Sequence, residues 1–144
     1  MEKDTKDPFN ELENIINIQM EKIYSKKTIE YSKNPVNVGR MNDPDGAAMI
    51  KGLCGDTMEI YLIIENDKIT EVKFFTDGCG VTLACGSAVT KLTKGKTIDE
   101  VLSLSPKDII NHLEGLPIEN IHCSILTANT LNKAIANYLL QKYI

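Results

Sequence analysis

The sequence lacks the long apolar segments of membrane proteins and secreted proteins. No stretch approaches the roughly 18 apolar residues that a membrane-spanning helix needs. The first ten residues are mostly polar and charged, and they do not form the apolar core of a signal peptide. We therefore expect a cytoplasmic protein that has no membrane partner.

An excess of positive charge is also missing. The 16 Lys and Arg residues are outnumbered by 20 Asp and Glu residues, and the two signs are interspersed along the chain. Proteins that bind nucleic acid usually carry a basic patch or stripe, so we expect no nucleic-acid partner. The chain has 144 residues, of which 42% are hydrophobic, and both values are typical of one globular domain. We expect a single domain over residues 1–144.

The chain contains four cysteines but no Cys-x-x-Cys pair. This absence argues against a thioredoxin-like redox site and against a zinc ribbon. Structural disulfides are disfavoured in the reducing cytosol. We therefore interpret the four thiols as ligands, as nucleophiles or as buried side chains.

The spacing of apolar residues predicts strands before most of the helices. Clean alternation over 57–65 and a second run over 69–76 predict an antiparallel hairpin, which a shorter strand over 47–52 joins. Helical periodicity predicts an N-terminal helix over 8–31, or two shorter helices in that range. Further helices, the last of them long, are predicted over 81–93, 97–102, 105–113 and 124–142. This order is typical of an α+β domain with a small antiparallel three-stranded sheet and with helices packed mainly on one face.

Three places at the ends of predicted elements carry residues that bind metals. Cys54 and Asp56 lie between two predicted strands, where a thiol and a carboxylate two positions apart can face one point. Cys79 stands between two glycines where the last strand meets a helix, and the helix N-terminus favours its thiolate. His122 and Cys123 come just before the final helix, which again places a thiol near a positive helix end. Ligands often lie at such element ends.

These side chains form a chemically coherent set of ligands. Three thiols, one imidazole and one carboxylate suit zinc or a small iron–sulfur cluster. Sulfur ligands select these soft metals over magnesium and calcium. A single cytosolic cysteine is more often a buried packing residue than a ligand. We interpret Cys85 in this way because it lies inside a predicted helix, although its closeness to Cys79 leaves a role in sulfur handling open.

Four segments together form a specific pattern. They are Tyr24-Ser25-Lys26-Lys27 with Asn34-Pro35-x-Asn37-Val38-Gly39, then Cys54-Gly55-Asp56 with Met58, then Gly78-Cys79-Gly80 with Ala84-x-Gly86-Ser87 and Thr90-x-x-x-x-Gly95-Lys96, and finally Leu116-Pro117 with His122-Cys123-Ser124. The joint pattern resembles the IscU/NifU-type family of iron–sulfur cluster assembly scaffolds, which have the SufE/NifU-like fold. The resemblance spans residues 24–138.

The resemblance implies a role for each predicted site residue. Cys54, Cys79 and Cys123 would bind the cluster. Asp56 would keep the cluster labile enough to leave, and His122 would be an alternative or transient ligand. Cys123 would accept sulfur as a persulfide from a cysteine desulfurase, with Fe2+ bound nearby. Electrons from a ferredoxin-type donor would complete a [2Fe-2S] cluster, which the scaffold would pass to apo iron–sulfur proteins without turnover of its own. Zn2+ could occupy the same site.

The chain departs from the family pattern in three places. The best-known members carry Leu-Pro-Pro-Val-Lys before the His-Cys pair, and a dedicated Hsp70-type chaperone reads that motif. Residues 116–120 are Leu-Pro-Ile-Glu-Asn instead, so a partnership with that chaperone is doubtful. Cys85 stands where a serine is common. Residues 1–23 exceed the usual N-terminus and are predicted to form an extra helix.

Two other functions stay open on the sequence. SufU-type relatives hold zinc and relay sulfur, but they carry a long insertion between the second and third cysteines and lack the histidine. Here Cys79 and Cys123 are 44 positions apart and His122 is present, which favours the IscU type. The other alternative is a small α+β protein whose zinc is purely structural. A homodimer is also left open.

Overall fold

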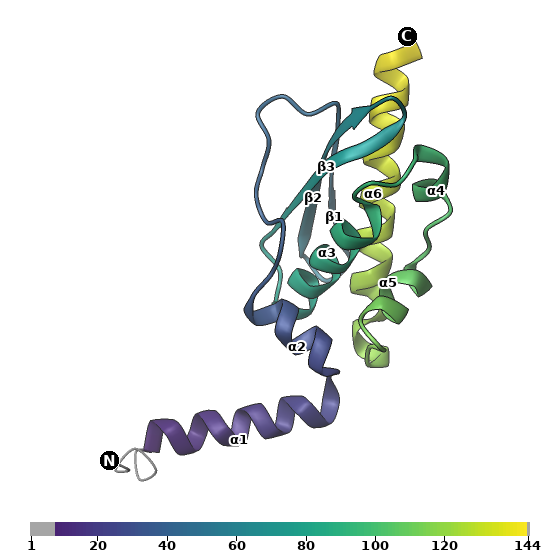
Figure 1. The fold of residues 1–144 in the computed structure, drawn as a ribbon. Coiled ribbons are helices and arrows are strands. Elements are labelled where there is room, and N and C mark those ends of the chain that lie inside the picture. The colour runs from purple at the N-terminus through teal and green to yellow at the C-terminus, as the bar shows by residue number, and fades with distance from the viewer. Residues whose placement is uncertain (1–7, 144) are drawn as a thin grey trace.

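The computed structural model describes residues 8–143, and the part of the predicted N-terminal extension over residues 1–7 lies outside them. Figure 1 shows one small sheet with helices beside it, which confirms the predicted α+β class. No described helix is long and apolar enough to cross a membrane. The elements in chain order are α1 (Pro8–Ile23), α2 (Lys26–Lys33), β1 (Gly46–Lys51), β2 (Thr57–Glu65), β3 (Lys68–Thr76), α3 (Gly80–Thr93), α4 (Ile98–Leu102), α5 (Pro106–His112), η2 (Ile118–Asn120) and α6 (Ile121–Tyr143).

The sheet has the predicted antiparallel order β1-β2-β3. Alternate residues of β2 point into the core, and Met58, Ile60 and Leu62 are completely buried. Phe74 of β3 lies opposite Ile60 and is also completely buried. The two-residue period of the sequence therefore identified the core face of the hairpin correctly.

One face of the sheet is covered by α3 and α6, as predicted (Figure 1). The close approach of α3 to β3 depends on Gly86, which sits against the ring of Phe74. A Cβ atom at Gly86 would lie 2.3 Å from the Cδ2 and Cε2 atoms of that ring, a distance that real Cβ atoms essentially never show. This glycine therefore sets how deeply α3 can pack against the sheet.

The loop that follows α2 is attached to α3 and to the free edge of β3. The backbone N–H of Val36 donates to Ser87 Oγ at 3.0 Å, and Asn37 Nδ2 donates to Thr90 Oγ1 at 3.0 Å. Val38 forms an isolated parallel bridge with Phe74. The loop therefore protects an edge strand that could otherwise pair with another chain.

The N-terminal region contains two helices, which is the second of the two predicted arrangements. The break falls at Ser25, whose side chain accepts a hydrogen bond from the N–H of Thr28 at 3.0 Å and so caps α2. Ser25 Oγ also donates to the carbonyl oxygen of Leu113, which fastens the start of α2 to the end of α5. In Figure 1, α1 projects from the rest of the molecule, whereas α2 packs against α3.

The final helix begins earlier than predicted. The short helical turn η2 leads directly into α6, which begins at Ile121. His122 and Cys123 therefore lie in the first turn of α6, and the prediction that they precede it is wrong. The sequence signal was obscured because Ile118–Asn120 already adopts helical geometry and supplies no clear cap between the two elements.

The strand register brings two junctions to one end of the sheet. Lys51 at the end of β1 pairs with Thr57 at the start of β2, and Met58 pairs with Thr76 at the end of β3. The β1–β2 turn and the β3–α3 junction therefore lie side by side. The predicted ligands Cys54, Asp56 and Cys79 are in these two segments.

We expect Gly86→Ala to destabilise the fold. Alanine is the better helix former by about 0.5–1 kcal/mol, but overpacking against a rigid buried ring costs about 1–3 kcal/mol. Because Phe74 is completely buried, the clash outweighs the helix propensity. Urea unfolding followed by circular dichroism should show a lower midpoint with an unchanged slope. The control Lys91→Ala, at an exposed position of α3, should change stability by less than about 0.5 kcal/mol. An unchanged or higher midpoint for Gly86→Ala would contradict this packing.

Candidate metal and sulfur site

One hydroxyl group, that of Thr82, connects three segments of the candidate site. Thr82 is completely buried in the first turn of α3. Its Oγ1 donates a hydrogen bond to Asp56 Oδ2 at 2.9 Å. The same oxygen lies 3.8 Å from Cys79 Sγ and 3.7 Å from Cys123 Sγ. The β1–β2 turn, the start of α3 and the start of α6 therefore meet at one atom.

Thr82 was missed by sequence analysis. A threonine three positions after Cys79 in a mostly apolar helix resembles an ordinary core residue. The available signal was its helical spacing, because a residue at the N-cap and a residue three positions later lie on the same side of the first turn. That spacing alone does not show that Asp56 and Cys123 arrive from elsewhere in the chain.

Cys79 is the N-cap residue of α3 and is exposed. The preceding Gly78 leaves room for the carboxylate of Asp56 beside Thr82. A Cβ atom at Gly78 would lie 2.7 Å from Asp56 Oδ2 and 2.8 Å from Thr82 Oγ1. The glycine before this cysteine thus allows the carboxylate and the hydroxyl to meet.

The turn between β1 and β2 presents Cys54 at the surface. The N–H of Gly52 donates to the carbonyl oxygen of Asp56 at 2.6 Å, and Gly55 adopts a positive φ of 95°. A second contact ties this turn to the β3–α3 junction, because the N–H of Thr57 donates to Asp77 Oδ1 at 2.8 Å. Cys54 is exposed. The turn that carries Cys54 and Asp56 thus lies next to the junction that carries Cys79.

Cys123 is enclosed by the fold, although the sequence places it near a helix end that favours a thiolate. It is only 2% exposed and belongs to the hydrophobic core. Burial raises the pKa of the Cys123 thiol, while the hydrogen bond with Thr82 acts in the opposite direction. The negative charges of Cys79, Cys54 and Asp56 raise this pKa further. In this conformation the effect of burial on the pKa of Cys123 is larger than that of the nearby helix end. The prediction that Cys123 has thiolate character is therefore corrected: burial favours the protonated thiol.

His122 is the neighbour best placed to take a proton from Cys123. Its Nε2 atom lies 3.6 Å from Cys123 Sγ. An imidazole nitrogen at this distance can accept the proton of the thiol and return it. His122 is half-buried, which leaves it in contact with solvent.

The structure brings the five predicted residues into one neighbourhood without a finished metal site. Asp56, Cys79 and Cys123 surround Thr82, and His122 contacts Cys123. The charge of Cys54 contributes to the raised pKa of the Cys123 thiol. Within residues 8–143, however, no three His, Cys, Asp or Glu side chains are grouped closely enough to hold a metal ion. Because the hydroxyl of Thr82 lies between Asp56 and the two sulfur atoms, local rearrangement is required before these groups share one ion.

Cys85 has the packing role that the sequence suggested. It is completely buried in α3, and burial raises the pKa of its thiol strongly. The charges of Cys123 and Cys79 also raise this pKa, so Cys85 lies near the site while remaining inaccessible from solvent. A part in sulfur handling stays a hypothesis.

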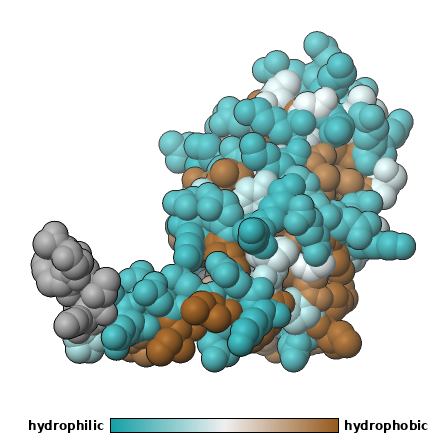
Figure 2. All heavy atoms as spheres, turned by 60° about the horizontal axis from the view of Figure 1, so that its bottom comes forward, coloured by the Kyte–Doolittle hydropathy of each residue, from teal (hydrophilic) through white to brown (hydrophobic). Residues whose placement is uncertain are grey.

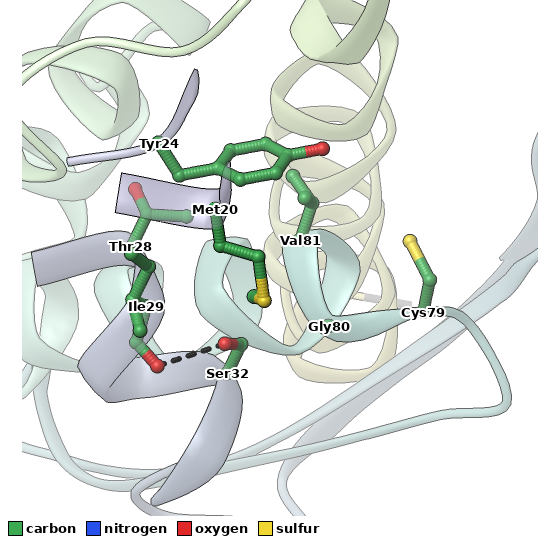
Figure 3. Close-up of a pocket in the computed structure, with 8 residues that line it drawn as sticks. All are labelled: Met20, Tyr24, Thr28, Ile29, Ser32, Cys79, Gly80 and Val81. Carbon is green, nitrogen blue, oxygen red and sulfur yellow. Dashed lines mark hydrogen bonds between the residues drawn. The ribbon is translucent and has the colours of Figure 1, made fainter. Parts of the chain in front are cut away.

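Two cavities flank the site. One, of about 170 Å³, lies between α1, α2 and the start of α3. Figure 3 shows Tyr24 and Met20 of the N-terminal segment facing Val81, with Cys79 at the rim. The other, of about 240 Å³, lies beside the β1–β2 turn and α6 and is lined by Ile50, Lys51, Gly52, Leu53, His122, Ile125, Leu126 and Asn129. A mainly apolar cavity therefore lies on each side of the site.

Alkylation should separate the thiols by accessibility. In the reduced, metal-free protein we expect iodoacetamide to modify Cys54 and Cys79 at least roughly tenfold faster than Cys123, because only a solvent-accessible thiolate reacts. The raised pKa of Cys123 means that its rate should keep increasing above about pH 9. Peptide mass spectrometry gives the order, and urea-unfolded protein serves as the control in which the four rates converge. Equal rates in the folded protein would contradict the burial of Cys123.

Comparison with known proteins agrees with this geometry. The chain is 39% identical over 117 residues to iron-sulfur cluster assembly scaffold protein IscU 1 of Archaeoglobus fulgidus, covering 81% of this chain and 76% of the relative. It is 40% identical over 120 residues to the scaffold protein IscU of Escherichia coli K12, covering 80% and 93%. The N-terminal NifU-like protein from Brucella abortus has the same fold, with a TM-score of 0.68 at 20% identity and coverage of 83% and 96%.

The matched region begins where α1 ends. The model of the NifU-like N terminal domain family matches residues 23–143, which leaves nearly all of α1 outside the family's common part. The matched region contains the three cysteine-bearing segments and Thr82. On this match and these identities, the chain belongs to the NifU-like N-terminal domain family, which includes the IscU scaffolds.

Proposed function

We propose that this protein is a scaffold on which [2Fe-2S] clusters are assembled and from which they are passed to apoproteins. The observation that carries the proposal is the meeting of Asp56, Cys79 and Cys123 at the buried hydroxyl of Thr82. Three separate segments contribute one cysteine each to this end of the sheet. A chain that kept these thiols only for packing would have no reason to place two of them at the surface.

The ligand chemistry supports iron and sulfide as the cargo. Thiolates bind iron–sulfur clusters and zinc, and they disfavour magnesium and calcium. Cys54, Cys79 and Cys123 would hold the cluster with Asp56, and His122 would be an alternative ligand. Zn2+ would bind the same groups. Relatives with about 40% identity are named as assembly scaffolds for iron–sulfur clusters.

The exposure of two ligands supports transfer rather than storage. Cys54 and Cys79 are at the surface, so a cluster held there would be open to an acceptor protein. Asp56 would add an oxygen ligand, which is a poorer match for a soft iron–sulfur cluster than a thiolate. The scaffold would therefore release its cluster readily and would need no catalytic turnover of its own.

Sulfur would arrive as a persulfide from a cysteine desulfurase in the cytoplasm. In that step the Cys123 thiolate attacks the outer sulfur of the donor's persulfide, the donor's cysteine leaves as a thiolate, and His122 holds the proton from Cys123. The 3.6 Å contact between His122 and Cys123 supports this assignment. Because Cys123 is buried, docking of the desulfurase must open the start of α6. The outer sulfur is then reduced to sulfide by a ferredoxin-type donor.

Anaerobic reconstitution tests the proposal. The protein would be incubated with ferrous iron, cysteine and a cysteine desulfurase, and absorption and Mössbauer spectra would be recorded. We expect the signature of a [2Fe-2S] cluster that moves to an apo-ferredoxin. If the protein instead binds Zn2+ tightly, forms a persulfide on Cys123 and assembles no cluster, the scaffold function is contradicted. That result would indicate zinc-dependent sulfur transfer.

Serine variants test the ligand assignment. Cys54→Ser, Cys79→Ser and Cys123→Ser should each reduce the amount of bound cluster, because each removes one thiolate. Cys85→Ser is the matched control, since it changes a thiol that is completely buried in α3, and we expect a mild effect. The readout is the iron and sulfide content after desalting. Equal cluster content in all four variants would defeat the assignment.

The Thr82–Asp56 hydrogen bond should control how fast the cluster leaves. We expect Asp56→Ala to hold the cluster longer. Thr82→Val should slow transfer in the same direction, because the carboxylate then has no hydroxyl to return to when it leaves the iron. A net hydrogen bond contributes about 1 kcal/mol, so the effect of Thr82→Val should be roughly tenfold or less.

A double-mutant cycle separates positioning from a general structural effect. If Thr82 acts through Asp56, the variant carrying both Asp56→Ala and Thr82→Val should transfer its cluster no more slowly than Asp56→Ala alone. Thr82→Ser keeps the hydroxyl and should restore the wild-type rate. Additive effects, or no rescue by serine, would show that Thr82 does not position the carboxylate.

A further inference from the structure

The helix α1 carries an exposed apolar surface outside the family's common part. None of the described residues of α1 is buried. Leu12, Ile15, Ile16 and Ile23 are between 48% and 59% exposed, and Figure 2 shows hydrophobic residues gathered along this helix. Single exposed apolar residues are ordinary on protein surfaces, but a contiguous patch usually marks an interaction site.

The apolar residues form one stripe with symmetric spacing. Phe9, Leu12, Ile16, Met20 and Ile23 follow one another at intervals of three, four, four and three positions. Residues three and four apart share a face of an α-helix, so these five side chains form a single row. The row reads the same in both directions from its centre at Ile16.

We propose that this row is a dimer interface in which α1 pairs antiparallel with α1 of a second copy of the chain. With Ile16 at the two-fold axis, Phe9 of one copy lies opposite Ile23 of the other, Leu12 lies opposite Met20, and Ile16 lies opposite itself. Every apolar side chain of the row thus meets an apolar side chain. A patch that is complementary to itself under a two-fold rotation is what a symmetric homodimer requires.

The position of α1 in the molecule favours the antiparallel arrangement. The rest of the chain is attached at the C-terminal end of α1, and the N-terminal end projects away from it (Figure 1). A parallel pair would bring both bodies to the same end of the two helices. An antiparallel pair places them at opposite ends and also aligns the two helix dipoles in opposite directions.

The size of the interface predicts weak, reversible association. At 1.5 Å per residue, the sixteen residues of α1 span about 24 Å. A contact limited to two such helices falls at the low end of specific interfaces, below about 1,200 Å². The dimer should therefore dissociate on dilution.

The proposed interface adjoins the candidate site. Met20 belongs to the row and also lines the cavity that has Cys79 at its rim, as Figure 3 shows. In the dimer, the Leu12 side chain of the second copy would contact Met20 and cover the outer side of this cavity. The inference goes beyond the proposed function and does not rest on it, because the association is measured without metal or sulfur.

Sedimentation equilibrium over a concentration series, under reducing conditions, tests the dimer. The wild-type mass should rise from 16.0 kDa towards twice that value as concentration increases. Ile16→Lys should lose association, because it places two lysines at the two-fold axis. The matched control is Ile18→Lys, which changes an isoleucine of similar exposure on the opposite side of α1 and should leave association unchanged. Circular dichroism should show that both variants stay folded.

Charge pairs test the register. Phe9→Lys and Ile23→Glu should each weaken the dimer, and mixing the two variants should restore it, because the new charges lie opposite each other only in the antiparallel pair. Mixing Phe9→Lys with Phe9→Glu should restore nothing. A wild-type protein that stays monomeric at the highest concentration overturns the proposal, as does equal loss in Ile16→Lys and Ile18→Lys. If mixing Phe9→Lys with Phe9→Glu restores the dimer and mixing Phe9→Lys with Ile23→Glu does not, the antiparallel arrangement is overturned.

Discussion

The hydrogen bond between Thr82 and Asp56 is the contact on which the geometry of the site depends. It joins the first turn of α3 to the β1–β2 turn, and the same hydroxyl reaches Cys79 and Cys123. A buried polar group left without a partner costs about 1–3 kcal/mol, so this contact also holds the turn in place. The ligands are therefore organised by a residue that is not expected to bind the metal. Under the proposed function, exchange of Asp56 between Thr82 and iron would give a physical reason for a cluster that is held and released.

This contact is possible only because the helices approach the sheet closely. Gly86 lets α3 lie against Phe74, and Gly78 leaves room for the carboxylate beside the hydroxyl. At the opposite end of β1, a Cβ atom at Gly46 would lie 2.6 Å from the carbonyl oxygen of Ala134, so α6 also packs closely against β1 there. The absence of side chains at these three positions lets α3 and α6 pack closely against the sheet. The three cysteine-bearing segments are thereby brought to the same end of the sheet.

Local sequence patterns predicted the sheet better than they predicted the site. The alternation over β2 identified its core face because a strand has a two-residue period that no other element shares. The start of α6 was placed too late because η2 already has helical geometry, and the burial of Cys123 was missed for the same reason. Thr82 could not be identified, because its importance comes from partners that are 26 and 41 positions away along the chain. The family motif pointed to the candidate ligands, but only the packing shows which groups restrain them.

The most direct test of this account is X-ray absorption at the zinc edge of the protein loaded with one equivalent of Zn2+. If the three thiols share one site, the spectrum should show three sulfur neighbours at about 2.3 Å together with one nitrogen or oxygen neighbour. Cys54→Ser should lower the sulfur number by one. A wild-type site with one sulfur neighbour or none would contradict the central claim that the segments meeting at Thr82 can bring Cys54, Cys79 and Cys123 to one metal ion.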